Sequence, residues 1–326
     1  FFEQMTAVAL LSFAEAKVEV AILETGLGGR LDATTAANAE IAAITRIDLD
    51  HQEYLGNTIE EIAAEKSAII HPGSIVIVAV QDARAMEVIF GRCQRYKIEP
   101  RLASEISVIK KGRNTSGNER DDLVESFRVA ASSVFDMVSD TGKYIDVVPG
   151  LRGEHQIENA KVAVLLAEVL QDKFEISPQG IVAGLENARH PGRLELSGRY
   201  LFDGAHNLGG ASALREYIEK FIRRPITMIF GAMSGKDVTA MAETLFPLAE
   251  TVILTKPANS RAMTATGLAD QIPPRLQPSD LILTDSVGHA IAEAQSRTAA
   301  NGLILVTGSL YLVGEAKTLL QEKSTL

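Results

Sequence analysis

The chain has 326 residues, enough for two ordinary domains with full cores, and its 46% hydrophobic and 23% charged residues indicate a globular protein. Its net charge of -10 argues against a general nucleic-acid surface, because phosphate binding needs clustered Lys and Arg. No apolar run approaches the ~20 residues of a transmembrane helix, so we expect no membrane partner. One cysteine, Cys93, excludes an internal disulfide framework and fits a reducing cytoplasm.

Strands alternate with helices in the first third of the chain, which predicts a parallel α/β sheet. The periodicity predicts helices over residues 1–16, 58–69 and 83–96 and buried strands over residues 18–23, 41–47 and 74–80. Thr58 is the expected N-cap of the second helix, because Glu61 stands at the capping-box spacing. The polar stretch 102–148 has short alternating segments, 126–134 and 144–148, that predict an antiparallel insertion or edge.

The second half of the chain predicts a second α/β series. Helices are expected over residues 154–170 and 177–185, and Pro191-Gly192 then breaks the helical pattern. Strands are expected near 194–202, 227–230, 251–255, 281–283 and 303–306, and helices near 210–221, 238–245, 286–298 and 310–323. The simplest organisation is a first domain over 1–187, a linker over 188–193 and a second domain over 194–326.

The segment LETGLGGRLDATT, Leu23–Thr35, follows the first predicted strand and sets Glu24, Arg30 and Asp32 around three glycines. Ligands of open α/β sheets bind just beyond the carboxyl ends of strands. The segment is neither a dinucleotide fingerprint nor a P-loop, because no Lys-Ser or Lys-Thr follows the glycines. A glycine turn with incidental charges is an equal alternative.

A second stretch, ITRIDLDHQEYLG, places Asp48, Asp50 and His51 at the end of the next predicted strand. Histidine and carboxylates are ordinary ligands of a divalent metal. The alternative is a turn with a hydrogen-bonded histidine. The acidic end of the neighbouring predicted strand, Glu24, favours the metal.

Polar loops that contain glycine follow several strands of the second half. Asp203 ends a predicted strand and is followed by His206 and Asn207 before a helix, a context in which helix N–H groups face a ligand. GAMSGKDV and VTGSLYLVGEA repeat this pattern after later strands. Gln156 and Asn159 begin a helix, where they can bind a purine base or simply cap and solubilise the helix. Together the loops predict one clustered site.

Seven motifs follow one another along the chain: ETGLGGRLDAT, DLDHQEYLGNTIEEIAAEKSAI, LRGEHQIENA, PGRLEL, DGAHN, FGAMSGKD and TGSLYLVGE. In this order they resemble the folylpolyglutamate synthase/dihydrofolate synthase family of the Mur-ligase superfamily, over nearly the whole chain. The resemblance implies a truncated central P-loop-type ATPase domain and a smaller Rossmann-like α/β C-terminal domain. It also implies ATP-dependent ligation of L-glutamate to a folate or dihydropteroate through an acyl phosphate, in a cytoplasmic monomer.

The resemblance also implies roles for residues in the central domain. Glu24 and His51 would bind Mg²⁺, which neutralises charge in phosphoryl transfer. Lys66 falls on the lysine that the family carbamylates to support a second metal; a surface lysine paired with Glu65 or Glu61 is the plain alternative. Arg30 and Asp32 would face the pterin or folate.

In the second half, the resemblance assigns residues to ATP and to glutamate. Asn159, Arg193 and Asp203 would hold ATP, and His206 would act near the γ-phosphate or the incoming glutamate. The weaker candidates for the glutamate side are Lys236, Ser309 and Arg261.

The family's P-loop sequence, G-x-x-x-x-G-K-[ST], does not occur in this chain, and Gly235-Lys236 does not substitute for it. Thr35, Ser67-Ala68 and Leu208 also depart from the family pattern but remove no metal or phosphate group. We therefore expect the chain alone to be inactive. A non-catalytic folate- or nucleotide-binding homologue is one alternative. A Mur-type peptidoglycan ligase is another, and the GLGGRLD run points away from it.

Overall fold

The computed structural model describes residues 1–111, 134–276 and 280–324, and the predicted segment at 126–133 lies outside them. The described residues form two compact units. The first comprises Phe1–Ile109, Met137–Ile145 and Glu158–Ile181, and the second comprises the described parts of Lys110–Asp136, Asp146–Ile157 and Val182–Leu326. The predicted domain bounds, 1–187 and 194–326 with a linker over 188–193, stay a prediction. None of the described helices combines the length and apolar run needed to cross a bilayer.

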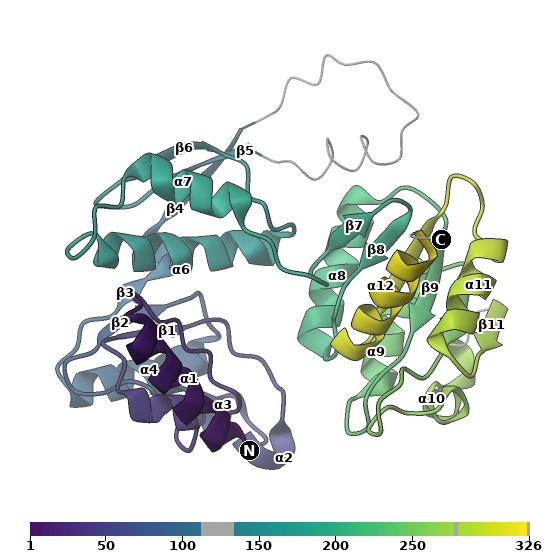
Figure 1. Cartoon of the computed structure of the whole chain (residues 1–326), viewed down its shortest axis with the longest axis horizontal. Coiled ribbons are helices and arrows are strands. Elements are labelled where there is room, and N and C mark those ends of the chain that lie inside the picture. The colour runs from purple at the N-terminus through teal and green to yellow at the C-terminus, as the bar shows by residue number, and fades with distance from the viewer. Residues whose placement is uncertain (112–133, 277–279, 325–326) are drawn as a thin grey trace. The chain divides into compact units, whose positions relative to one another are not determined.

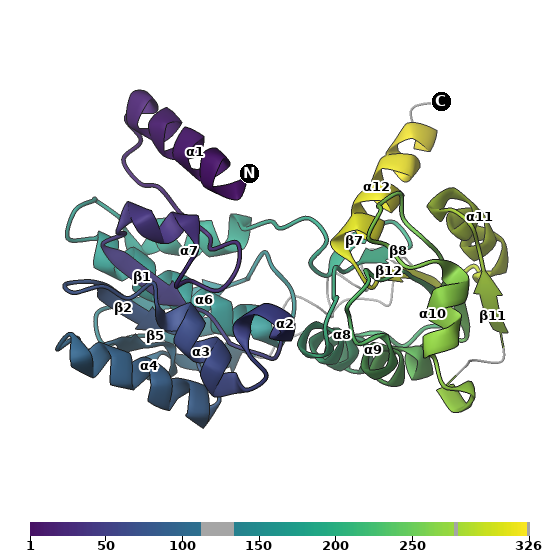
Figure 2. The ribbon, with the colours of Figure 1, turned by 90° about the horizontal axis from the view of Figure 1, so that it is seen from below.

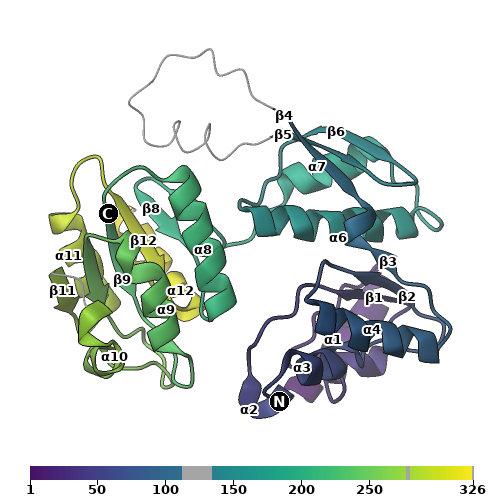
Figure 3. The same cartoon turned by 180° about the vertical axis from the view of Figure 1, so that it is seen from behind.

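The first unit contains a parallel sheet of order β1-β2-β3 (Figure 1). Its elements are α1 (Phe2–Ala16), β1 (Ile41–Ile44), α2 (Gln52–Leu55), α3 (Ile59–Ser67), β2 (Ile75–Val78), α4 (Ala83–Arg95) and β3 (Arg101–Leu102), with 3-10 turns at Ala33–Ala37 and Ala103–Glu105. Helices α3 and α4 lie side by side (Figure 3) and pack their apolar faces on β1 and β2. The capping box predicted for Thr58 and Glu61 is present.

The strand predicted over residues 18–23 is wrong. The segment has no strand structure, and Val18, Val20 and Ile22 are exposed. A strand is stable only when its backbone N–H and C=O groups pair with a neighbour, and among the described residues this segment has none. The sequence pattern reports apolar character, which does not reveal whether a neighbouring strand is present. The argument that Glu24 and His51 end two strands of one sheet therefore fails for Glu24.

A small sheet of order β4-β5-β6 follows, with β4 (Ser107–Lys111), β5 (Val134–Val138) and β6 (Lys143–Val147). Strands β5 and β6 are joined by a tight turn in which Ser139 N–H donates to the Gly142 carbonyl at 3.0 Å. Such a short connection requires antiparallel strands, as predicted for this part of the chain. Helices α6 (Glu154–Leu170) and α7 (Pro178–Asn187) come next, close to their predicted bounds.

A buried carboxylate joins three elements of the first unit. Glu168 on α6 has a side chain only 1% exposed, and its carboxylate accepts from Arg101 Nη2 on β3 at 2.7 Å. It also accepts from Tyr144 Oη on β6 at 2.9 Å and from the Ser139 hydroxyl in the β5–β6 turn. Burial opposes ionisation, but the hydrogen bonds outweigh it and hold the pKa of Glu168 below its ordinary value.

The second unit contains a six-stranded sheet of order β11-β10-β9-β12-β8-β7 (Figure 1). All neighbouring strands are parallel except the β7–β8 pair. The strands are β7 (Glu195–Ser197), β8 (Tyr200–Phe202), β9 (Ile226–Phe230), β10 (Thr251–Leu254), β11 (Asp280–Leu283) and β12 (Leu303–Thr307). The helices are α8 (Leu208–Phe221), α9 (Val238–Leu245), α10 (Ala265–Gln271), α11 (Val287–Arg297) and α12 (Leu310–Ser324).

Alternate residues of this sheet serve two different cores. On β9, Met228 and Phe230 join the core with α8, α9 and α10, whereas Ile229 joins the core with α11 and α12. Figure 2 shows α8 and α9 on one face of the sheet and α12 on the other. Both faces of the strands are covered, which explains their continuous apolar sequence and gives the doubly wound α/β fold.

Two details of the second unit differ from the prediction. The single strand expected over residues 194–202 is a hairpin, because Gly198 takes a positive φ of 56° and turns the chain between β7 and β8. Helix α10 was not predicted; it has only seven residues, too few for a clear helical period, although Thr264 caps it.

The Glu168 network predicts a loss of stability on Glu168→Gln. The substitution leaves the Arg101 charge without its partner, so we expect the free energy of unfolding to fall by about 2–3 kcal/mol at pH 7. Because the folded-state pKa is lowered, this contribution is present above the ordinary value of 4.5 and is lost as the pH falls through the folded-state pKa. Urea unfolding from pH 7 to pH 3 measures both effects.

The control is Glu40→Gln, which removes an exposed ion pair with Lys173 in the same unit and should cost less than ~0.5 kcal/mol. Equal costs for the two variants would contradict the buried role of Glu168.

Candidate functional site

The loop after Glu24 is organised by the carboxylate of Asp32. Its oxygens accept from the backbone N–H groups of Gly26 (2.7 Å), Leu27 (3.0 Å) and Thr34 (2.9 Å), and from the Thr34 hydroxyl (2.6 Å). Burial opposes ionisation, but these hydrogen bonds together outweigh it and hold the pKa of Asp32 below its ordinary value. Asp32 therefore closes the loop as an ionised N-cap of the 3-10 turn that follows. Its predicted contact with a pterin stays a prediction.

Two glycines let this loop lie directly on helices α2 and α3. Gly28 has a φ of +68°, and a Cβ atom there would lie 2.9 Å from Leu55 Cδ2 on α2. A Cβ atom on Gly29 would lie 2.8 Å from the carbonyl oxygen of Glu65 and 2.9 Å from that of Lys66, both on α3. Only glycine permits this close approach of two backbones. The loop is thereby fixed beside Lys66.

Arg30 and Lys66 differ in their partners. Arg30 donates its backbone N–H to the Glu65 carbonyl at 3.1 Å and its Nε to Glu65 Oε1 at 2.7 Å. Glu61 is engaged in the capping box, so neither acid is the partner of Lys66 that the plain alternative assumed. The half-buried Lys66 has no hydrogen bond or ion pair with any residue that the structure describes. Its ammonium group is available for modification or for a ligand.

Glu24 and His51 are both exposed in this part of the first unit. His51 is the N-cap of α2 and has a φ of +52°, and its Nε2 lies 4.0 Å from Asp50 Oδ2. Glu24 makes no hydrogen bond or ion pair with a described residue. No group of three or more His, Cys, Asp or Glu gathers as a metal site in the described ranges. Binding of one ion by Glu24 and His51 stays a prediction.

Several predicted residues of the second unit follow the carboxyl ends of adjacent parallel strands. Asp203 follows β8, Ser309 follows β12, and Gly231 follows β9. A Cβ atom on Gly308 would lie 2.7 Å from the Gly231 carbonyl, and Gly308 N–H donates to the Ala205 carbonyl at 3.1 Å. The loops after β8, β12 and β9 are therefore in contact, which confirms that these loops cluster at one edge of the sheet.

Asp203 is the buried acid of this edge, 6% exposed. Its Oδ2 accepts from Leu194 N–H and its Oδ1 from Ala205 N–H, each at 2.9 Å. Burial raises the pKa of Asp203 above its ordinary value, against the opposing effects of these hydrogen bonds and of the nearby Arg193 and His206 charges. Backbone hydrogen bonds thus join the Arg193 turn to the Asp203 turn, and the roles predicted for Arg193, Asp203 and His206 from PGRLEL and DGAHN stay a prediction.

His155 at the start of α6 belongs to the same group. Burial lowers the pKa of His155 below its ordinary value, and the nearby charge of Arg193 lowers it further. The His206 ring lies beside its own turn, with Nδ1 2.9 Å from the Gly204 carbonyl. Asn159, one of the residues predicted to hold ATP, is exposed on α6, and its role with ATP stays a prediction.

The three candidates for the glutamate side lie on connected loops. Ser234 N–H donates to the Arg261 carbonyl at 2.9 Å, which ties the loop of Lys236 to that of Arg261. Arg261 Nη2 donates to the hydroxyl of Tyr311 at 3.2 Å, and Tyr311 is two residues after Ser309. Ser309 is 2% exposed and its hydroxyl accepts from Leu312 N–H at 3.1 Å, so it caps α12. Binding of glutamate by these residues stays a prediction.

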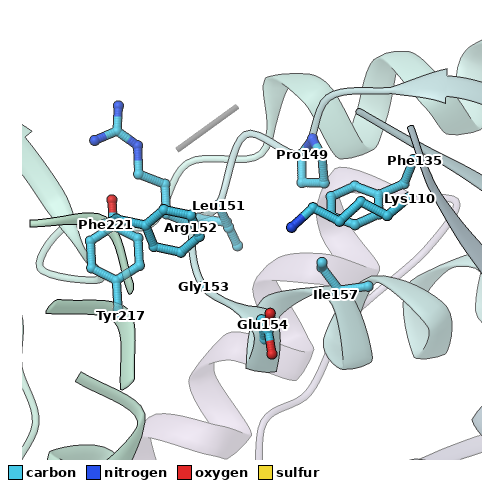
Figure 4. Close-up of a pocket in the computed structure, with 10 residues that line it drawn as sticks. All are labelled: Lys110, Phe135, Pro149, Leu151, Arg152, Gly153, Glu154, Ile157, Tyr217 and Phe221. Atoms are coloured by element: carbon cyan, nitrogen blue, oxygen red, sulfur yellow. The ribbon is translucent and has the colours of Figure 1, made fainter. Parts of the chain in front are cut away.

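Sequence reasoning missed Tyr311, the Arg30–Glu65 pair and the Glu195–Lys317 pair, because in each case the partner lies far away in the chain. A hollow in the second unit contains none of the predicted site residues, so we assign it no part in the site (Figure 4). It is lined by Lys110, Phe135, Pro149, Leu151, Arg152, Gly153, Glu154, Ile157, Tyr217 and Phe221.

Two family models match the chain: the Mur ligase middle domain over residues 3–167, and the Mur ligase, glutamate ligase domain over residues 192–310. The dihydrofolate synthase/folylpolyglutamate synthase of Bacillus subtilis is 33% identical over 323 residues, which cover 97% of this chain and 71% of that protein. A probable bifunctional folylpolyglutamate synthase/dihydropteroate synthase of Halobacterium salinarum is 32% identical over 321 residues. The chain spans only 37% of the length of that relative.

Solved structures agree with this likeness. The folylpolyglutamate synthase of Mycobacterium tuberculosis complexed with ADP matches with a TM-score of 0.85 at 31% identity, over 98% of this chain and 71% of that one. The folylpolyglutamate synthase of Thermotoga maritima matches with a TM-score of 0.77 at 29% identity, over 98% of this chain and 70% of that one. The chain belongs to the Mur ligase family, with the folylpolyglutamate and dihydrofolate synthases.

The close approach at Gly29 predicts that Gly29→Ala destabilises the first unit by about 1–3 kcal/mol, because the new methyl group meets two backbone carbonyls. It also predicts faster amide exchange at Gly26 and Leu27, whose N–H groups Asp32 holds. Urea unfolding and hydrogen exchange measure the two effects. The control, Gly91→Ala within α4, meets nothing within 4 Å and should be neutral or stabilising by up to ~1 kcal/mol. A fully stable Gly29→Ala variant would refute the close packing.

Proposed function

We propose that this chain provides most of an enzyme that joins L-glutamate to the carboxylate of a folate or dihydropteroate at the expense of ATP. The observation that carries the proposal is the contact of the Arg193 turn with the Asp203 turn at the carboxyl edge of the second unit's sheet, in a chain that matches the Mur ligase, glutamate ligase domain. The related structure of Mycobacterium tuberculosis was solved with ADP, which supports a nucleotide as one substrate.

The chemistry follows from the groups present. ATP transfers its γ-phosphoryl group to the substrate carboxylate, and the amine of glutamate then displaces phosphate to form the amide. Arg193 supplies a fixed positive charge for the phosphates, and Asp203 holds the turn that carries it. We place His206 near the γ-phosphate or the incoming amine, and Asn159 with the nucleotide. Arg30 is an exposed residue of the Gly28–Asp32 loop and can face an anionic folate.

Glutamate is assigned to the loops around Arg261. The Arg261 guanidinium and the ammonium of Lys236, which lies on the connected loop, provide two positive charges for the two carboxylates of glutamate. The buried Ser309 hydroxyl lies at the start of α12, where helix N–H groups also favour an anion.

We propose Mg²⁺ as the cofactor, held by Glu24 and His51, with Lys66 as a further ligand if it is carbamylated. The fit rests on the exposed His51 imidazole beside Asp50 and on the Glu24 carboxylate and Lys66 ammonium, neither of which pairs with a residue that the structure describes. When bound, the ion neutralises the negative charge that develops on the transferring phosphoryl group.

We also propose that a P-loop from further chain completes the central domain. No P-loop sequence occurs in these 326 residues, and the chain spans 71% of the Bacillus subtilis relative. The α1 face with Met5, Val8 and Leu11 is exposed, as are Val18 and Ile22 after it. An apolar surface of this kind is expected to be covered by protein.

The purified 326-residue chain should show negligible ATP- and glutamate-dependent ligation, because its sequence contains no P-loop to cradle the β- and γ-phosphates. The full-length product of its gene should ligate glutamate, and Asp203→Asn in that product should lower kcat/KM at least about tenfold. Assays with dihydropteroate and with tetrahydrofolate, run separately, identify the acceptor. Measurable ligation by the 326-residue chain refutes its inactivity. A full-length product without ligase activity would instead favour a binding homologue.

The metal proposal predicts that Mn²⁺, used as a paramagnetic substitute, binds the chain and that Glu24→Gln weakens its affinity about tenfold or more. Free Mn²⁺ is measured by electron paramagnetic resonance during titration. The control, Glu40→Gln, removes an exposed carboxylate from the same unit and should leave the affinity unchanged. Equal affinities of the wild type and Glu24→Gln would exclude Glu24 as a ligand.

A further inference from the structure

The turn that carries Arg193 has an uncommon backbone. Gly192 has a φ of +72°, and Leu194 has a φ of +45° although it is not glycine. Leu194 is also 2% exposed, so its side chain is fixed in the core. A buried leucine takes a left-handed conformation only where surrounding contacts hold it there. The position of Arg193, between these two residues, depends on those contacts.

Four hydrogen bonds hold the turn, and one of them joins Arg193 N–H to the His190 carbonyl at 3.2 Å. Leu194 N–H donates to Asp203 Oδ2 at 2.9 Å, and Gly204 N–H donates to the Gly192 carbonyl at 2.8 Å. The fourth bond joins Gly192 N–H to Glu195 Oε2 at 2.8 Å. Two of the bonds thus come from the Asp203 turn, and Glu195 supplies the only side-chain acceptor that contacts Gly192 in the described part of the chain.

Glu195 is fixed in turn by helix α12. Lys317 Nζ lies 2.6 Å from Glu195 Oε1 and 2.7 Å from Oε2, and both side chains are partly buried. Lys317 and Val313 are four residues apart on one face of α12. A Cβ atom on Gly192 would lie 3.1 Å from Val313 Cγ1, so the same face packs on the turn.

We propose that Glu195 is a positioning residue: held by Lys317, its carboxylate fixes the Gly192–Leu194 turn so that Arg193 faces Asp203 and His155. The role of Glu195 in catalysis rests on the proposed function, in which Arg193 holds ATP. The positioning of Arg193 by Glu195 does not rest on it. The competing view is that Glu195 and Lys317 merely join β7 to α12 as an ion pair. The first view requires an acceptor for Gly192 N–H to keep Arg193 in position, and the second view does not.

Two variants of equal charge separate these views. Glu195→Gln removes the carboxylate charge but keeps an oxygen within reach of Gly192 N–H. Glu195→Met has nearly the same size and removes both the charge and the acceptor. Any direct effect of the lost Glu195 charge on the measured pKa of His155 is therefore the same in the two variants. Arg297→Met on α11 is the control, because it breaks an exposed ion pair with Glu293 in the same unit.

The imidazole of His155 reports the position of Arg193, because the Arg193 charge contributes to the lowered pKa of His155. The pKa is measured by NMR titration of the histidine ring signals in the 326-residue chain. The Arg193→Ala variant gives the reference shift: without the Arg193 charge, the pKa of His155 should rise toward its ordinary value of 6.5. The measurement requires neither ATP nor ligation, so it stands or fails independently of the proposed function.

We expect Glu195→Met to produce at least about half of the Arg193→Ala shift, and Glu195→Gln less than about a quarter. Arg297→Met should produce none. Equal shifts in the Gln and Met variants, or no shift in the Met variant, overturn the proposal. If Glu195→Met does not fold, Glu195→Ala, which also lacks an acceptor within reach of Gly192, provides the same comparison.

Discussion

The carboxylate of Asp32 is the contact on which the first part of the proposed site depends. Its hydrogen bonds with Gly26, Leu27 and Thr34 close the loop after Glu24, and the closed loop then packs through Gly29 on the backbone of α3. Without this packing, Arg30 would lose Glu65, and the loop would not be fixed beside Lys66. A single ionised side chain thus stabilises the loop that holds Arg30 against helix α3.

In the second unit, a parallel sheet brings the candidate site residues together. Parallel strands bring the ends of β8, β12 and β9 to one edge, where Asp203, Ser309 and the Gly231 loop meet. Helix α12 then connects two regions of this edge. Lys317 supports the Arg193 turn through Glu195, and Tyr311 contacts Arg261 in the loop assigned to glutamate. Movement of α12 would therefore affect both proposed substrates.

Much of this arrangement follows from the sequence, and the exceptions have physical causes. Helix periodicity and apolar runs predicted β9, β10, β12 and α6, because their burial pattern repeats along the chain. The strand predicted over residues 18–23 was wrong because the apolar character of this segment does not show whether a neighbouring strand exists. Pairs such as Glu195 with Lys317 are separated by more than a hundred residues, so no local pattern predicts them.

The candidate site was predicted where glycine and polar residues follow strands. Asp203 and His206 were singled out in this way, and the contact of their turn with the Arg193 turn is a consequence of the fold. The capping role of Asp32 was not foreseen, because an acid in a glycine loop fits a ligand contact and a turn equally well.

In the proposed reaction, ATP phosphorylates the acceptor carboxylate before glutamate attacks it. The full-length product of the gene, supplied with an acceptor whose two carboxylate oxygens are both ¹⁸O, tests this step. Mass spectrometry of the released inorganic phosphate then follows the label. We expect one ¹⁸O atom to appear in phosphate for each amide bond formed in the presence of ATP and glutamate. Amide formation that releases unlabelled phosphate would contradict it.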